Sequence, residues 1–191
     1  DPRPPALLGA RAKAWVATAL TELDPKIPIL VSPCPVLNLF FFQDVWQKIE
    51  QASQYVRANA ETEWDLEFWI PSEVAWLCEL LALTFPGATA YALSGDFHCS
   101  YVRKDPLTAG DPSAGTLVQF TSSPVKNGMG DKQAALVTFA ERWHFDRYER
   151  LMDGKPALFF RPNNFGHLSN EDGVMSLRFY CEDGTVRQVA R

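Results

Sequence analysis

Apolar and polar side chains alternate most clearly between Ala135 and Asp146. A strand sends successive side chains to opposite faces, so this period of two predicts a long strand. One predicted face carries Val137, Phe139, Trp143 and Phe145, interrupted only by Glu141, and the other carries Thr138, Arg142, His144 and Asp146. The pair Asp153-Gly154 then predicts a tight turn into a short second strand over Ala157–Phe160.

The first half of the chain has helical periodicity instead. Apolar residues recur at Leu8, Ala12, Trp15, Ala19 and Leu23, which predicts an amphipathic helix that packs through Trp15 and stops at Asp24-Pro25. A second helix is predicted over 38–58, with Asn38 as its N-cap. A third is predicted over 72–85, capped by Ser72. Because the third is apolar almost all round, we expect it to be the central core helix.

Strand signals dominate the second half. A short strand is predicted at Ile29–Val31, and further strands at 88–93, 97–104, 116–123, 174–181 and 185–191. Turn residues at Ser94-Gly95-Asp96 and at Asp183-Gly184 predict hairpins. The segments 105–115 and 124–133, rich in Pro, Gly and Asp, predict loops, and a loop is also expected around His167.

Helices early and strands late indicate one α+β domain over 1–191, helix-rich over 1–87 and strand-rich over 88–191. We expect the N-terminal helices to pack on a strongly curved, mainly antiparallel sheet, forming a cone or partly closed barrel. Its cavity would hold a small ligand. A composition of 47% apolar and 13% aromatic residues excludes a wholly disordered chain.

Charge narrows the choice of partner. The formal net charge of −5 argues against nucleic acid, whose phosphates attract clustered Lys and Arg. An acidic stretch without Lys or Arg, carrying Glu61, Glu63, Asp65, Glu67, Glu73 and Glu79, predicts either a solvated face or a docking surface for a protein partner. No apolar run approaches the ~20 residues of a membrane span. Cysteines 34, 78, 99 and 181 lack zinc-binding or disulfide-framework spacing, and with no glycosylation sequon they favour a cytoplasmic protein with free thiols.

The candidate chemistry lies on the polar face of the long predicted strand. Arg142, His144 and Asp146 would line up there about 7 Å apart. A neutral imidazole oriented by a carboxylate can abstract a proton, and a guanidinium can stabilise the anion that results. These three residues are therefore the predicted catalytic set of a lyase, isomerase or cyclase.

Aromatic and histidine side chains complete the predicted cavity. Trp143, Tyr101 and His98 are the candidate ligand-binding residues. The pair His144 and Asp146 also imitates two arms of an iron-binding facial triad, with His98 or His167 as the third ligand. Such short spacings are common by chance, so no metal and no cofactor is predicted. No nucleotide-binding or common hydrolase motif occurs.

Two functions follow from these patterns. The first is a small-molecule-binding α+β domain with acid–base chemistry at His144 and Asp146. The alternative is a non-catalytic interaction or regulatory domain that uses the acidic stretch and exposed aromatics. Neither pattern specifies a substrate or an oligomeric state.

Overall fold

The computed structural model describes residues 8–23, 27–40, 43–44, 69–95, 99–122, 130–160 and 162–190. Its helices are α1 (Ala10–Leu23), α4 (Pro71–Thr84), α5 (Asp131–Glu141) and the 3-10 helix η1 (Arg142–Arg147). Its strands are β1 (Ile29–Val31), β2 (Thr89–Ser94), β3 (Ser100–Thr108), β4 (Asp111–Thr121), β5 (Leu158–Phe159), β6 (Asn164–Glu171), β7 (Val174–Cys181) and β8 (Val186–Gln188).

The strands form two sheets. One has the order β1-β2-β4-β3-β5, in which β1, β2 and β4 run parallel while β3 and β5 are antiparallel to their neighbours. The other is the antiparallel sheet β6-β7-β8. The mixture of helices and strands agrees with the predicted α+β content. The cone or barrel is wrong, because the five-stranded sheet ends in separate edges at β1 and β5 and neither sheet closes.

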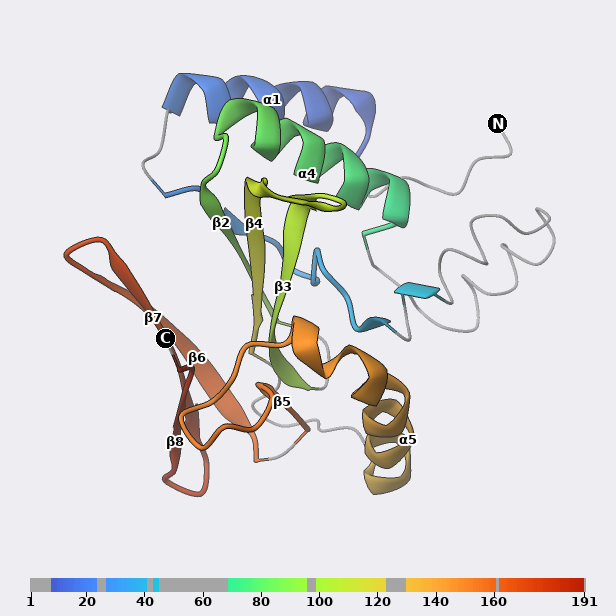
Figure 1. The fold of residues 1–191 in the computed structure, drawn as a ribbon, viewed down its shortest axis with the longest axis vertical. Coiled ribbons are helices and arrows are strands. Elements are labelled where there is room, and N and C mark those ends of the chain that lie inside the picture. The colour runs from blue at the N-terminus through green and yellow to red at the C-terminus, as the bar shows by residue number, and fades with distance from the viewer. Residues whose placement is uncertain are drawn as a thin grey trace, which may run out of the picture.

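Two apolar cores lie on opposite faces of the five-stranded sheet. On one face α4 packs with Leu77 and Leu81 against β3 and β4, and α1 lies beside α4 (Figure 1). On the other face Phe120 of β4 meets Phe179 of β7, with ring centroids 4.7 Å apart. The alternation of side chains along β4 therefore serves both cores, and the molecule is layered as helices, mixed sheet and antiparallel sheet.

The segment 135–146 is helical, so the predicted long strand is wrong. The buried side chains of α5 are Val137 and Glu141, four positions apart, as expected when one face of a helix packs inward. Phe139 and Trp143, which were placed on the apolar face of the predicted strand, are exposed. The apolar residues of this stretch do not share one helix face, since Leu136 is exposed as well and only Val137 and Glu141 of α5 are buried. Tertiary packing, not the apolar pattern, therefore decides that this segment is helical.

Several other predictions change in the structure. The hairpin at Ser94-Gly95 is absent, because β2 pairs in parallel with β4 rather than with β3. The predicted loop 105–115 is instead the paired end of β3 and β4, and His167 lies on β6 rather than in a loop. Trp15, expected to anchor α1, is 71% exposed.

The predictions that agree with the structure are those that depend only on residues close together in the sequence. Strand β1 has the predicted bounds, and α4 begins and ends within a residue of the prediction, although Ile70 rather than Ser72 occupies its N-cap position. Asp183-Gly184 joins β7 to β8, with Gly184 at φ 80°. In the predicted helix 38–58, Phe40, Gln43 and Asp44 are helical, and residues 41–42 and 45–58 lie outside the described part.

Candidate functional site

A belt of polar side chains crosses the helix-covered face of the five-stranded sheet. In the register of the sheet, Arg103 on β3 lies opposite Gln119 on β4, and Ser94 on β2 lies opposite Thr121. These positions alternate with the apolar residues of the opposite core, so strand geometry places them on one face. The belt separates the α4 core from a second cluster around Tyr101 and Val137.

Gln119 is the centre of this belt. Its Oε1 accepts the backbone N–H groups of Val36 and Leu37 at 2.9 and 3.1 Å. Its Nε2 donates to Ser94 Oγ and Thr121 Oγ1 at 2.9 and 3.2 Å. One fully buried amide thus ties the segment that follows β1 to the ends of β2 and β4.

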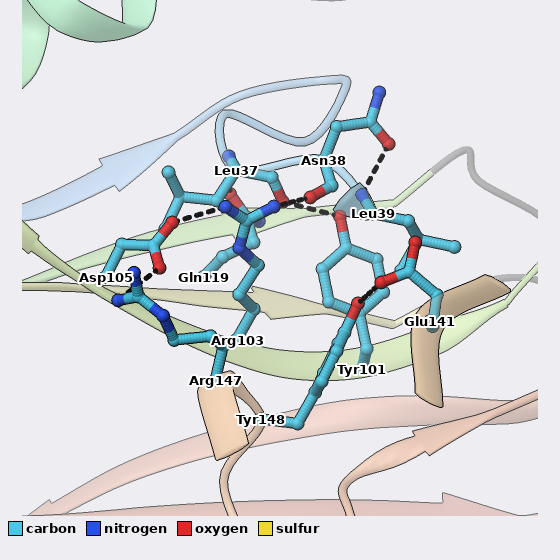
Figure 2. A network of polar contacts seen from close by, with 10 residues as sticks. All are labelled: Leu37, Asn38, Leu39, Tyr101, Arg103, Asp105, Gln119, Glu141, Arg147 and Tyr148. Atoms are coloured by element: carbon cyan, nitrogen blue, oxygen red, sulfur yellow. Dashed lines mark hydrogen bonds and ion pairs between the residues drawn. The ribbon is translucent and has the colours of Figure 1, made fainter. Parts of the chain in front are cut away.

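The guanidinium of Arg103 is buried beneath the same segment (Figure 2). It donates to the Asn38 carbonyl and to the Asp105 carboxylate, and its flat face lies 3.5 Å from the ring centroid of Phe40. Arg147 approaches the other oxygen of Asp105 at 3.2 Å. Because each buried charge needs a partner, these contacts hold η1 and the 38–40 segment against β3.

A second buried pair lies beside it. Tyr148 donates its hydroxyl to Glu141 Oε2 at 2.7 Å, and Tyr101 donates to the Leu37 carbonyl at 2.8 Å (Figure 2). Burial, and then the neighbouring Glu141 charge, raises the pKa of Tyr148. Burial likewise raises the pKa of Tyr101. Both phenols are therefore donors at neutral pH and cannot act as phenolate bases there.

The carboxyl ends of the parallel strands carry hydroxyl groups. Ser94 ends β2 and its Oγ lies 3.0 Å from Thr121 Oγ1, while Ser122 follows β4 and donates its N–H to the Ser94 carbonyl at 3.1 Å. Ser122 Oγ also donates to Asn164 Oδ1 at 3.1 Å. Ser94 and Ser122 are half-buried, so two hydroxyls reach the edge of the sheet from a buried support.

The predicted catalytic residues Arg142, His144 and Asp146 lie on η1 rather than on a strand. His144 stacks on Phe40, with ring centroids 4.1 Å apart and an interplanar angle of 17°. Asp146 is exposed, and the guanidinium of Arg142 covers the rings of Phe139 and Trp143. The alignment on one strand face, which brought the three together in the prediction, is therefore absent.

The predicted ligand-binding residues are also separated. Trp143 is 73% exposed, whereas Tyr101 is fully buried with its hydroxyl engaged. His98 lies outside the described residues. No cavity lined by Trp143 and Tyr101 follows from these positions, because one side chain faces solvent and the other is packed in the interior.

The acidic stretch divides in the same way. Its members at 61–67 lie outside the described part of the chain, Glu79 is exposed, and Glu73 is buried. Glu73 accepts the Leu8 N–H at 2.9 Å and lies 3.6 Å from Lys13 Nζ, so it joins α4 to the start of α1.

Among the described helices, none is long and apolar enough to span a membrane. Within those same ranges, no three His, Cys, Asp or Glu side chains gather as a metal site would require.

Together these features define a layered α+β protein, in which the segment after β1 covers a belt of polar side chains on the mixed sheet. No protein-family model matches the chain, and no curated protein matches it. Among solved structures, one described as "Structure of PhoD" is similar, with a TM-score of 0.52 and 12% identity over 98% of this chain. This chain covers 38% of the PhoD chain, and at that identity the likeness shows a shared fold alone.

Sequence reasoning missed the belt because its members are far apart in the chain. Gln119 sits in a strand that was predicted, yet its partners Val36 and Leu37 lie more than eighty positions earlier. One signal was available: Arg103 and Asp105 interrupt β3 on the face that also carries Tyr101 and Leu107. Charges on a buried strand face indicate a paired network.

Proposed function

We propose that the protein binds a small oxygenated molecule at the carboxyl ends of β2 and β4. Ligands of open sheets with parallel strands commonly bind outside the carboxyl ends of those strands. The observation that carries the proposal is that two half-buried serines, Ser94 and Ser122, stand side by side at this end of the sheet, where the Ser122 N–H donates to the Ser94 carbonyl at 3.1 Å. We thus keep the small-molecule binding expected from the sequence, but we propose the binding site at the edge of the sheet instead of inside a cone.

The chemistry of this edge suits oxygen-rich ligands. Ser122 Oγ donates its proton to Asn164, so its oxygen can accept a hydrogen bond from a ligand hydroxyl. Ser94 Oγ accepts from Gln119 and shares a hydrogen bond with Thr121, which leaves it one further hydrogen bond for a ligand. Gln119, Thr121 and Asn164 hold these two side chains from behind. Preorganised hydroxyls lose little conformational entropy when a ligand binds. Acid–base catalysis by His144 and Asp146 stays a prediction, because no hydrogen bond among the described residues joins either side chain to Ser94 or Ser122.

A ligand screen tests the proposal directly. We expect thermal stabilisation by one or more members of a panel of polyols, sugars and hydroxy acids. Ser94→Ala combined with Ser122→Ala should then weaken the best binder at least about tenfold, the cost of roughly one good hydrogen bond. Ser113→Ala, which removes an exposed hydroxyl at the opposite end of β4, is the matched control. Binding that survives the double substitution would refute the site.

The alternative function, protein interaction, has one observation in its favour. Leu136, Phe139 and Trp143 are all more than half exposed along α5 and η1. The guanidinium of Arg142 lies 3.9 Å from the Phe139 ring centroid and 4.5 Å from that of Trp143. A guanidinium with rings beside it can still offer its N–H edge to a carboxylate. This face therefore suits a partner segment in which an acidic residue is flanked by apolar ones.

That alternative is tested with a labelled acidic, leucine-containing peptide and fluorescence anisotropy. Arg142→Glu should abolish binding, since it reverses the charge between the two rings. Lys132→Glu makes the same charge change at the other end of α5 and should leave most of the affinity. Equal losses in the two variants would mean that only net charge matters.

A further inference from the structure

The sequence has three Asp-Gly pairs, and each lies in a tight turn. They are Asp153-Gly154, Asp172-Gly173 and Asp183-Gly184, and all three aspartates are exposed. An aspartate side chain can react with the next backbone nitrogen when glycine follows, because glycine has no Cβ to block the approach. The three turns therefore hold the same reactive pair in different surroundings.

In two of the turns the carboxylate is held by the residue two positions later. Asp153 Oδ1 accepts the Lys155 N–H at 3.1 Å. Asp183 Oδ1 accepts the N–H and the hydroxyl of Thr185, at 2.9 and 2.6 Å. The pKa of Asp153 is lowered chiefly by the Lys155 N–H, and the pKa of Asp183 chiefly by the Thr185 hydroxyl. Both carboxylates are thus kept ionised and turned away from the adjacent glycine nitrogen.

Asp172 lies in a different kind of turn. It joins β6 to β7 at a hairpin tip that projects from the rest of the molecule (Figure 1). Val174, the residue two positions later, is paired with Glu171 across the hairpin and has no side-chain donor. Among the described residues, no hydrogen bond or ion pair holds the Asp172 carboxylate. This side chain can therefore turn toward the Gly173 nitrogen.

The backbone at the tip also favours the reaction. Asp172 has φ 52°, and in the described part of the chain it alone among residues other than glycine has a positive φ. That conformation costs an L-residue free energy that glycine escapes, so the turn opens more easily at Asp172. The Gly173 N–H donates to the exposed side chain of Asn170 at 2.9 Å, whereas Gly154 and Gly184 donate to backbone carbonyls. An exposed side chain rotates away more readily than a backbone carbonyl.

We propose that Asp172 is a modification site that forms isoaspartate, ahead of Asp153 and Asp183. The Gly173 nitrogen attacks Cγ of the protonated Asp172 carboxyl, a C–N bond forms, and one water leaves to give a five-membered succinimide. Water then adds to either ring carbonyl. Attack at the main-chain carbon of Asp172 breaks its bond to the Gly173 nitrogen and leaves the chain running through Cγ, which is isoaspartate. Attack at Cγ restores aspartate.

One water is lost and one is regained, so the mass of the chain is unchanged and no other reactant is needed. The modification involves none of the residues of the proposed ligand site at Ser94 and Ser122. Each proposal can therefore fail while the other stands.

Water carrying heavy oxygen measures the reaction, because each passage through the ring leaves one labelled oxygen in the product. The folded full-length chain is incubated in this water at neutral pH and then digested in ordinary water with a protease that cuts after glutamate. The three pairs then lie on separate peptides, 150–171, 172–182 and 183–191. We expect at least about threefold more label at Asp172 than at either other aspartate, the effect of one modest hydrogen bond.

Two comparisons separate the effect of the fold from that of the sequence. In the urea-unfolded chain all three turns are lost, so the three aspartates should take up similar amounts of label. Thr185→Val removes the hydroxyl donor to Asp183 and should raise the label there at least about threefold, with Asp172 unchanged. Equal labelling of the three sites in the folded chain, or a preference for Asp172 that persists in urea, would overturn the proposal. An unchanged label at Asp183 in Thr185→Val would overturn the protective role given to the hydrogen bonds.

Discussion

Tyr148 and Glu141 are seven residues apart, and their side chains form a buried pair against β3. Glu141 was the single interruption in an otherwise apolar pattern, and in the structure it is fully buried. An interrupting carboxylate is tolerated inside a protein only where donors meet it. The sequence shows the interruption but cannot show that Tyr148 folds back to supply the donor.

Tyr148→Phe removes that donor and little else. We expect a loss of about 1–3 kcal/mol in the free energy of unfolding, because the Glu141 carboxylate loses a hydrogen bond in the interior. Urea denaturation at neutral pH measures the change. Tyr180→Phe, a half-buried tyrosine stacked on Phe165, is the control and should stay within about 0.5 kcal/mol of the parent. Equal effects would show that the bond to Glu141 contributes nothing particular.

His144 and Asp146 have different surroundings despite their spacing of two. His144→Ala deletes the stack on Phe40 and should destabilise the protein by about 1 kcal/mol. Asp146→Asn, at an exposed position, should change stability by less than about 0.5 kcal/mol. The same two variants test the predicted acid–base role, if the protein converts any compound of the ligand panel into a product. Loss of that turnover in both folded variants would support catalysis by His144 and Asp146, and unchanged turnover would rule it out.

At the level of elements, the predictions that held were local. Asp183-Gly184 supplies the positive φ of a tight turn without help from the rest of the chain, and so does Asp153-Gly154. Strand pairing depends on distant segments, which explains why β2 was assigned to β3 when it pairs with β4. The helix α5 was missed for the same reason: only the packing of Val137 and Glu141 against β3 and η1 distinguishes it from a strand.

The contact between the two sheets depends on one glycine of β6. A Cβ added to Gly166 would lie 2.6 Å from Phe120 Cε1 and 2.8 Å from Ser122 Cβ. Because Phe120 also packs on Phe179, it cannot move without disturbing the shared core. The absence of a side chain at Gly166 is what lets β6 lie across the end of β4.

Gly166→Ala should therefore lower the free energy of unfolding by about 1–3 kcal/mol through overpacking. The measurement is thermal or urea unfolding followed by far-ultraviolet circular dichroism. Gly9→Ala, where an added Cβ meets nothing within 4 Å, is the control and should be nearly neutral. Because Ser122 borders Gly166, a parallel loss of ligand binding would also support the proposed edge site. A fully stable Gly166→Ala protein would contradict the close packing of the two sheets.

At the scale of the whole molecule, the layers bury acidic groups that ionise only at high pH. Burial, and then the charge of Asp105, raises the pKa of Cys78 to about 11 from an ordinary 9.0. Burial also raises the pKa of Cys99 and of Tyr101. The thiols at Cys34, Cys78, Cys99 and Cys181 are all buried. The layered interior, rather than any local motif, keeps these groups protonated.

Stability should therefore fall at alkaline pH. A raised pKa in the folded state means that the unfolded chain loses its proton first. The contribution of the protonated Cys78 thiol to the free energy of unfolding is complete below about pH 9 and is lost as the pH rises toward 11. For Cys78 the loss is on the order of 2 kcal/mol, and the buried tyrosines act in the same direction. Urea unfolding measured at half-unit intervals from pH 7.5 upward would follow this loss of stability. Cys78→Ala should flatten the plot of unfolding free energy against pH between 9 and 11, because that thiol is no longer there to ionise. A parent protein whose stability is constant across this range would show that solvent reaches these groups in the folded state.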